Sequence, residues 1–403
     1  MPCAVSIKSV ITDVDSVLIV ELYTGKLKYR VEQPTSPRPM SQQPELYATA
    51  VAVAVPAVEA VLATAPATNA ADVSSDRGYG VDEGAAAEFL RTHAWPPGLS
   101  KALVKCLKKN PYRFFIIDDS GSMQSGDGNI VVRGRNIPCS RWMELTESLK
   151  FHVALARHAR CPTEFRPLNS CLPIMIGCGS DDTENANQNR LMELFDAGPS
   201  GGTPLCQHIN EVCSIVRRLE HSLKSSGQRA SLIICTDGEA SDGDVAQALR
   251  PLQALPIDVV IRLCTDADDV MTYWNNVEKN LELKLDILDD WKGEALEIRK
   301  SNPFVNYALC LHRFRESGVT LKEFDLLDEG QLSWEHSRNL LSVLFDKQMP
   351  SPQLDPTAFF STVRHENDRE PKVYDVLLRR QAPLVNMTEL RRAYGPKNGC
   401  AVM

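Results

Sequence analysis

The stretch Arg113–Ser122, with the sequence RFFIIDDSGS, decides the fold. Its four apolar residues, Phe114-Phe115-Ile116-Ile117, end abruptly at Asp118-Asp119-Ser120-Gly121-Ser122. A buried strand of a parallel sheet has this pattern where it delivers polar side chains to the carboxyl edge of the sheet. The sequence therefore predicts a buried strand here, with a functional site at the edge where the strand ends.

Two further segments carry the same kind of chemistry. Ser200-Gly201-Gly202-Thr203-Pro204 is a polar loop, and Leu232-Ile233-Ile234-Cys235-Thr236 is a second apolar run that ends in Asp237-Gly238. Together these segments resemble the metal-ion-dependent adhesion site of von Willebrand factor A domains, in which Asp-x-Ser-x-Ser is followed by a distant Thr and a distant Asp after a strand. The resemblance implies a metal site made of Asp118, Ser120, Ser122, Thr203 and Asp237.

The chemistry of these residues suits a small, hard dication. All of the candidate ligands are oxygens, and a site with several hydroxyls and few carboxylates leaves Mg²⁺ or Mn²⁺ electrophilic. The resemblance implies that the hydroxyls bind the metal directly and that the acids bind it directly or through water. It also implies a protein partner whose exposed Asp or Glu becomes the last ligand. Asp119 occupies the variable position of the motif and is expected to face away from the metal.

Beyond this motif, strands alternate with helices, which predicts a doubly wound, Rossmann-like α/β fold. The expected strands after the first are 163–167, 172–177, 232–236, 257–263 and 284–288, and the expected helices are 142–160, 186–195 and one through residues 209–219. A glycine-rich, charged loop is expected at Gly126–Arg135, beside the metal. Two helices within Asp82–Lys109 are expected to pack against the sheet just before its first strand.

The whole chain divides into five expected segments. These are an N-terminal β-hairpin segment at 1–32, a flexible low-complexity linker at 33–83, the von Willebrand factor A-like domain at 84–300, a helical extension at 301–348, and a connector and tail at 349–403. The alanine-rich run from Ala48 to Ala71 lacks bulky side chains and is broken by prolines, so it cannot bury enough surface to fix one structure. The connector is expected because four prolines lie within residues 349–371.

Composition limits the partners and the compartment. The chain has 403 residues, is 43% hydrophobic and 24% charged, and carries a net charge of −8, which offers no footprint for nucleic acid. Its 12 cysteines include no Cys-x-x-Cys pair, which favours reduced thiols in the cytoplasm. A zinc site of Cys161, Cys171, Cys178 and His158 is an alternative with unfamiliar spacing, and the thiols fit better as small buried hydrophobes.

The two ends of the chain bear on localisation. Met1–Val20 has Asp13 and Asp15 within its apolar stretch, which does not fit a secretory signal. Cys400-Ala401-Val402-Met403 fits the prenylation signal Cys-aliphatic-aliphatic-X, and the final Met favours farnesyl transfer. A farnesylated Cys400 would give peripheral membrane association, although one lipid chain binds membranes only marginally. A chance match at this terminus is the alternative.

Two classes of function remain open. The preferred class is a metal-dependent protein-binding module that turns nothing over. The alternative is a hydrolase, either one that uses the metal to polarise a phosphoryl or acyl group or one similar to haloacid-dehalogenase phosphatases, whose Asp-x-Asp nucleophile motif resembles Asp13 and Asp15. The binding module is preferred because no Gly-x-Ser-x-Gly or Gly-x-x-x-x-Gly-Lys motif occurs.

Overall fold

A computed structural model describes two compact units, Met1–Ser75 and Asp76–Met403. The described residues are 8–13, 16–23, 26–32, 80–132, 135–170, 172–265, 267–281, 285–318 and 321–395. In the first unit, β1 (Lys8–Asp13), β2 (Ser16–Tyr23) and β3 (Lys26–Glu32) form an antiparallel sheet in that order. β2 and β3 form the hairpin expected from the sequence. Of the linker expected at 33–83, residues 33–79 lie outside the described residues.

The second unit is built on a six-stranded sheet with the strand order β11-β10-β9-β4-β7-β8. β8 runs antiparallel to β7, and the other neighbouring pairs are parallel. The chain passes from β4 through β7 to β8, and then returns to place β9, β10 and β11 on the other side of β4. The order therefore reverses between β4 and β9, and ligands of such sheets bind at the carboxyl ends of the strands beside this reversal. The strands are β4 (Tyr112–Ile117), β7 (Thr163–Pro167), β8 (Ile174–Ile176), β9 (Ala230–Thr236), β10 (Ile257–Leu263) and β11 (Leu285–Leu288).

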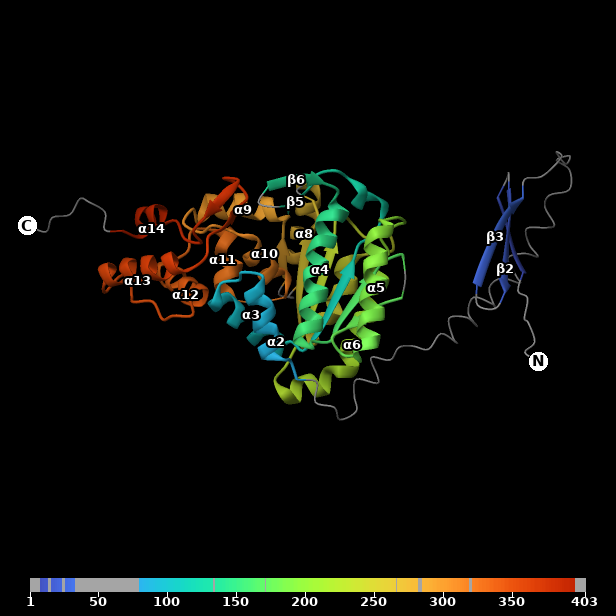
Figure 1. Ribbon diagram of the computed structural model, residues 1–403, viewed down its shortest axis with the longest axis horizontal. Helices are drawn as coiled ribbons and strands as arrows, with labels where there is room; N and C mark the ends of the chain where they lie inside the picture. Colours follow the sequence, from blue (N-terminus) through green and yellow to red (C-terminus); the bar gives the residue numbers. More distant parts are fainter. Residues whose placement is uncertain are drawn as a thin grey trace, which may run out of the picture. The chain divides into compact units, whose positions relative to one another are not determined.

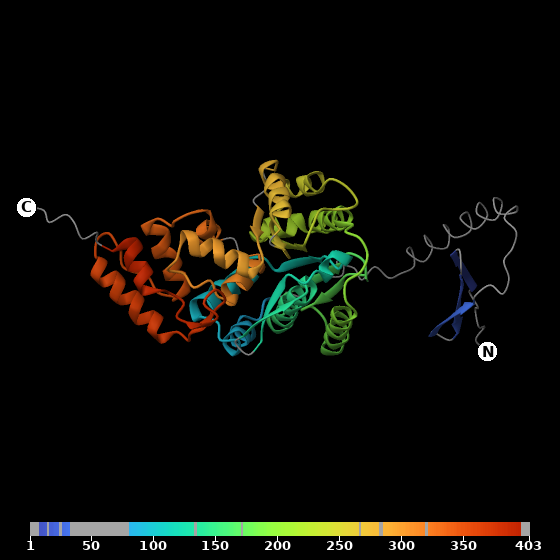
Figure 2. The same cartoon turned by 90° about the horizontal axis from the view of Figure 1, so that it is seen from above.

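Helices cover both faces of this sheet. α4 (Arg141–Ala159) and α5 (Asp181–Ala197) lie on one face, and α6 (Leu205–Ser226), α7 (Val245–Leu249) and α8 (Asp268–Lys279) lie on the other (Figure 1, Figure 2). All residues of β9 are buried, as expected for a parallel strand covered on both sides. The short 3₁₀ helices η2 (Gly121–Gln124) and η3 (Arg250–Ala254) complete this part. The structure confirms the α/β class and a mostly parallel sheet flanked by helices, which is compatible with a doubly wound fold.

Capping interactions fix the start of the helices nearest the site. α4 begins after Ser140, whose hydroxyl accepts a hydrogen bond from the Met143 backbone N–H. α6 has no side-chain cap of its own. Instead, the carboxylate of Asp242 accepts hydrogen bonds from the backbone N–H groups of Cys206 (3.0 Å) and Gln207 (2.8 Å). The loop after β9 therefore holds the first turn of α6 in place.

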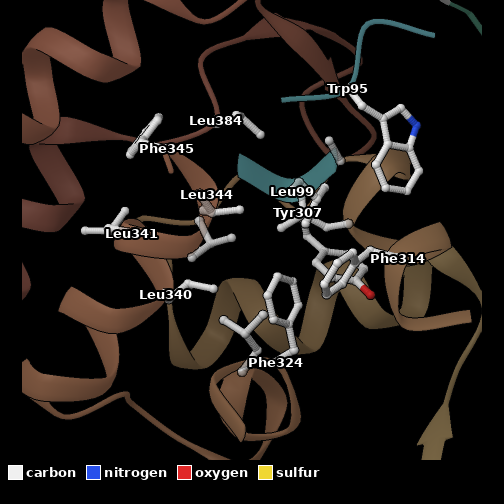
Figure 3. Packing of buried hydrophobic residues seen from close by; sticks show 14 of the residues in the cluster. Trp95, Leu99, Tyr307, Phe314, Phe324, Leu340, Leu341, Leu344, Phe345 and Leu384 are labelled. Carbon is white, nitrogen blue, oxygen red and sulfur yellow. The ribbon is translucent and has the colours of Figure 1, made fainter. Parts of the chain in front are cut away.

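A second hydrophobic core, separate from the one around the sheet, lies where the first helices of this unit meet its C-terminal helices. α2 (Glu83–Thr92) contacts α4, and α3 (Pro97–Lys109) contacts α12 (Trp334–Leu344) and α10 (Leu309–Glu316). Figure 3 shows Leu99 of α3 among Phe314, Phe324 and Leu340 of the C-terminal helices. The prediction that the Asp82–Lys109 helices pack against the sheet is wrong. Helix α4 covers the nearby face of the sheet, and the apolar residues of α2 and α3 lie in the second core instead.

Two other segments differ from the sequence-based expectation. Gly126–Arg135 is not a plain loop, because β5 (Gly128–Val132) pairs with β6 (Arg135–Cys139) as an antiparallel hairpin. The segment 349–371 is not a plain connector, because α13 (Pro356–Arg369) occupies most of it. Its proline fits the first turn of a helix, and Asp355 caps that turn. The remaining elements are α9 (Trp291–Ser301), α11 (Lys322–Glu329), β12 (Val373–Asp375), β13 (Arg380–Ala382) and α14 (Met387–Tyr394).

A buried arginine joins the C-terminal helices to the edge of the sheet. Arg315 of α10 donates hydrogen bonds to Glu294 of α9 (2.6 Å), Asp286 of β11 (2.9 Å) and Asp328 of α11 (3.0 Å). A guanidinium buried this deeply requires carboxylate partners. The segment 301–348 is therefore attached to the edge strand β11 and to α9 through buried ion pairs.

Residues 396–403, which include the expected lipidation site Cys400, lie outside the described residues. Among the helices that the structure describes, none has both the length and the apolar character needed to cross a bilayer.

The contact between α3 and α12 leads to a test of the second core. A Cβ atom added at Gly98 would lie 2.1 Å from the carbonyl oxygen of Val343, whereas one added at Gly84 in α2 would meet only the Asp82 carboxylate at 3.6 Å. Gly98→Ala should therefore lower the free energy of unfolding by about 1–3 kcal/mol. Gly84→Ala, the matched control, should leave it unchanged or raise it by up to about 1 kcal/mol. Urea denaturation measures both, and equal stability of the two variants would contradict the packing described.

Candidate metal centre

Two neighbouring strands deliver the two acids of the site. In the register of the sheet Ile117 of β4 lies beside Cys235 of β9, and the Asp118 backbone N–H donates to the Cys235 carbonyl at 2.9 Å. Asp118 follows β4 directly and Asp237 follows β9 directly, so both emerge at the same carboxyl edge, beside the reversal of strand order. Both residues are buried. The fold thus places two buried carboxylates close together at this edge.

Hydrogen bonds connect four of the five residues expected to bind metal. The hydroxyls of Ser120 and Ser122 are 2.9 Å apart, and the Ser122 hydroxyl donates to Oδ1 of Asp237 at 2.8 Å. The Ser120 backbone N–H donates to Oδ1 of Asp118 at 3.0 Å. The structure therefore brings Asp118, Ser120, Ser122 and Asp237 together.

Thr203 lies in a loop that adjoins this group. The Gly121 backbone N–H donates to the Gly201 carbonyl at 3.1 Å, and the Thr203 N–H donates to the Ser241 hydroxyl at 3.1 Å. The loop needs glycine at 201, which has φ +103° and where a Cβ would lie 2.7 Å from the Asn169 side chain. Backbone contacts to both other loops thus place Thr203 beside the site.

Asp119 serves the architecture of the site. Its Oδ1 accepts hydrogen bonds from the backbone N–H (2.9 Å) and side-chain Nδ2 (3.0 Å) of Asn169, and its Oδ2 accepts one from the Ser170 hydroxyl. These donors belong to the loop after β7, so the Asp119 carboxylate is directed toward that loop, as its variable position in the motif predicts. It is therefore poorly placed to act as a general base.

Two further residues contact the acids of the site, Thr236 and Arg141, and neither was expected from the sequence. The Thr236 hydroxyl donates to Oδ2 of Asp118 at 2.7 Å. Arg141 donates from Nη1 to Oδ2 of Asp237 at 2.9 Å, and from Nε and Nη2 to the two carboxylate oxygens of Asp127 at 2.7 and 2.6 Å. Thr236 could have been suspected because it immediately precedes Asp237, but Arg141 carries no local signal in the sequence.

The electrostatics differ between the two sides of the site. Burial raises the pKa of Asp118, and the charge of Asp237 adds to that effect, while hydrogen bonds from Ser120 and Thr236 oppose it. The hydrogen bonds from Arg141 lower the pKa of Asp127. Keeping the carboxylate of Asp118 ionised therefore costs free energy of folding. The charged carboxylate of Asp127, in contrast, is stabilised by Arg141.

The donor set fits a hard dication that accepts hydroxyl ligands. Two buried carboxylates and two serine hydroxyls are linked within hydrogen-bond distances, and Arg141 shows that a cation is already drawn to Asp237. Among the described residues there is no group of three or more His, Cys, Asp or Glu side chains that could hold a metal. A metal at this edge would therefore depend on the hydroxyls. The alternative zinc site cannot be assembled from described residues, since Cys171 lies outside them.

No protein-family model matches the chain, and no curated protein matches it either.

The raised pKa of Asp118 leads to a stability prediction. Because the folded pKa lies above that of an unfolded aspartate, the native state binds the proton more tightly than the unfolded chain, and stability falls as pH rises from the unfolded pKa to the folded one. The charge of the buried carboxylate therefore lowers stability at neutral pH, and Asp118→Asn, which removes that charge, should raise the unfolding free energy of the metal-free protein at pH 7 by about 1 kcal/mol. The amide oxygen can still accept from Ser120, and its Nδ2 can donate to Thr236.

Asp127→Asn is the matched control and carries the opposite sign. Its folded pKa is lowered, so its charge contributes stability that is present above the unfolded pKa and is lost as pH falls through the folded pKa. This substitution should therefore destabilise the protein at pH 7. Thermal unfolding in the presence of a chelator, at pH 7 and again near pH 4, measures both effects, and a destabilised Asp118→Asn protein at pH 7 would refute the assignment.

Proposed function

We propose that the protein is a divalent-metal-dependent protein-binding module of the von Willebrand factor A type. The observation that carries this proposal is the hydrogen-bonded chain of Asp118, Ser120, Ser122 and Asp237 at the carboxyl edge of the sheet, beside the reversal of strand order. Mg²⁺ or Mn²⁺ would be held by these residues together with Thr203. When bound, the metal supplies an electrophilic position that accepts a carboxylate from outside.

The residues of the chain keep that position available in three ways. The hydroxyls of Ser120 and Ser122 contribute oxygen without charge, so they satisfy the metal less fully than carboxylates would. Burial of Asp118 and Asp237 keeps water away from the protein side of the site. The loop that carries Thr203 frames the open side, where an Asp or Glu of a protein partner would approach.

Binding is favoured over hydrolysis by the surroundings of the possible catalytic groups. The Ser122 hydroxyl is engaged by Asp237, and the Asp119 carboxylate is engaged by Asn169 and Ser170. The dehalogenase-like alternative also lacks support, since β1, which ends at Asp13, pairs with β2 as an antiparallel strand rather than leading into a parallel βα unit. Prenylation at Cys400 stays a prediction from the sequence.

A metal titration tests this function directly. Asp237→Ala should abolish calorimetric binding of Mg²⁺ and Mn²⁺, because it removes one of the two carboxylates of the site. Asp258→Ala is the matched control: it lies in β10 near the opposite edge of the same sheet, where its carboxylate pairs with Arg229, and it should titrate like the wild type. Identical isotherms for wild type and Asp237→Ala would rule out the site.

Affinity capture separates binding from turnover. Wild-type protein should retain a partner in Mg²⁺ that it releases in chelator, and Asp237→Ala should retain none in either condition. A parallel assay with a generic phosphate ester should show no turnover. Metal-dependent hydrolysis that Asp237→Ala removes would instead favour the hydrolase.

A further inference from the structure

Arg141 has a position that helix formation alone does not explain. It is the first residue of α4, directly after the Ser140 cap, where the partial positive charge of the helix dipole disfavours a cation. Its guanidinium nevertheless lies mostly buried, with 15% of the side chain exposed, between two carboxylates. The reason for an arginine here must therefore lie in the carboxylates that it contacts.

Those carboxylates are Asp237 and Asp127. Nη1 of Arg141 donates to Oδ2 of Asp237 at 2.9 Å, and the forked Nε and Nη2 pair holds both oxygens of Asp127. The other oxygen of Asp237 accepts from Ser122. Without metal, both oxygens of Asp237 thus have protein donors, and one of these donors carries a positive charge.

We propose that Arg141 is the counter-cation of the metal-free site and that a divalent metal competes with its guanidinium for Asp237. This inference rests on the proposed function, because it concerns the same site. A dication bound beside Asp237 repels a guanidinium hydrogen-bonded to the same carboxylate, so the two cations oppose each other. By thermodynamic linkage the effect is reciprocal: the Arg141–Asp237 contact weakens metal binding, and bound metal weakens the Arg141–Asp237 contact.

The competition for Asp237 should also affect the β5–β6 hairpin, because Arg141 pairs with Asp127 next to that hairpin. Asp127 immediately precedes β5, whose first residue packs so closely on α4 that a Cβ at Gly128 would lie 2.7 Å from the Ser140 carbonyl oxygen. The Asn129 backbone N–H also donates to Glu144 of α4 at 2.7 Å. When metal displaces Arg141 from Asp237, the Asp127–Arg141 pair loses its attachment to the loop after β9. The β5–β6 hairpin then loses one of the contacts that connect it to the loops around Asp118 and Asp237.

Metal titration of Arg141 variants tests the competition. Arg141→Gln should bind Mg²⁺ and Mn²⁺ about tenfold more tightly than the wild type, within the usual range of coupling between two sites. Arg141→Lys keeps the charge but cannot span both carboxylates, so it should bind with intermediate affinity. Arg157→Gln is the matched control. It makes the same change of charge on the same helix, about 24 Å along it, where the side chain contacts Asn185 and Gln188, and it should bind like the wild type.

Hydrogen–deuterium exchange provides a readout that a general change of charge would not give. Adding Mg²⁺ to the wild type should increase amide exchange in β5, and adding it to Arg141→Gln should change that exchange little, because the link to Asp237 is already absent. Circular dichroism confirms that each variant is folded.

The outcomes distinguish this inference from the proposed function. If the wild type binds metal and neither Arg141 variant binds it more tightly, the competition is refuted while the metal site stands. Absence of metal binding in every protein overturns both proposals. Metal binding by Arg141→Gln but not by the wild type would also support the competition, and would mean that the Arg141–Asp237 contact prevents binding altogether.

Discussion

Two carboxylates buried side by side at the ends of adjacent parallel strands are the constraint on which this edge of the molecule depends. β4 and β9 are neighbours, so Asp118 and Asp237 must emerge together, and like charges in a buried site raise each other's free energy. The surrounding structure offsets this cost with the hydroxyls of Ser122 and Thr236 and with the charge of Arg141. The loops after β4 and β9 and the start of α4 therefore have positions fixed by electrostatics as well as by packing.

Helix α4 also connects this edge of the sheet to the C-terminal helices through charged and polar side chains. Glu144, Ser148 and His152 follow Arg141 on α4 at helical spacing, and Ser148 donates to Glu316 of α10 at 2.6 Å. Burial alone would raise the pKa of Glu316, but His312, His152 and Arg262 hold it well below its usual range. Arg262 of β10 also donates to Glu144 at 2.6 Å. The C-terminal helices are thus joined to the sheet by a buried ionic network that begins one helical turn from Arg141.

The sequence predicted what depends on local pattern. The strands at 163–167 and 257–263 were placed with the bounds that the structure has, because short apolar runs between turn signals are distinctive, and the approach of Asp118 to Asp237 followed from strands ending in acids. The environment of α2 and α3 was not predictable, since an amphipathic pattern shows that a face is covered but not by what. Arg141 was missed for a related reason. Its role depends on Asp127, 14 residues before it, and on Asp237, 96 residues after it, and no periodicity links such positions.

The balance of charge at this edge bears on the affinity that the proposed site would have for a divalent metal. Asp118, Asp127 and Asp237 with Arg141 leave two negative charges, which one divalent ion would neutralise. Sites that bind divalent ions very tightly gather more charged ligands. Here the guanidinium of Arg141 already stabilises Asp237, so under the proposed competition a metal would gain less from that carboxylate than from a free one. For the proposed binding module, such a site suits reversible occupancy, in which the carboxylate of a protein partner would supply the remaining negative charge.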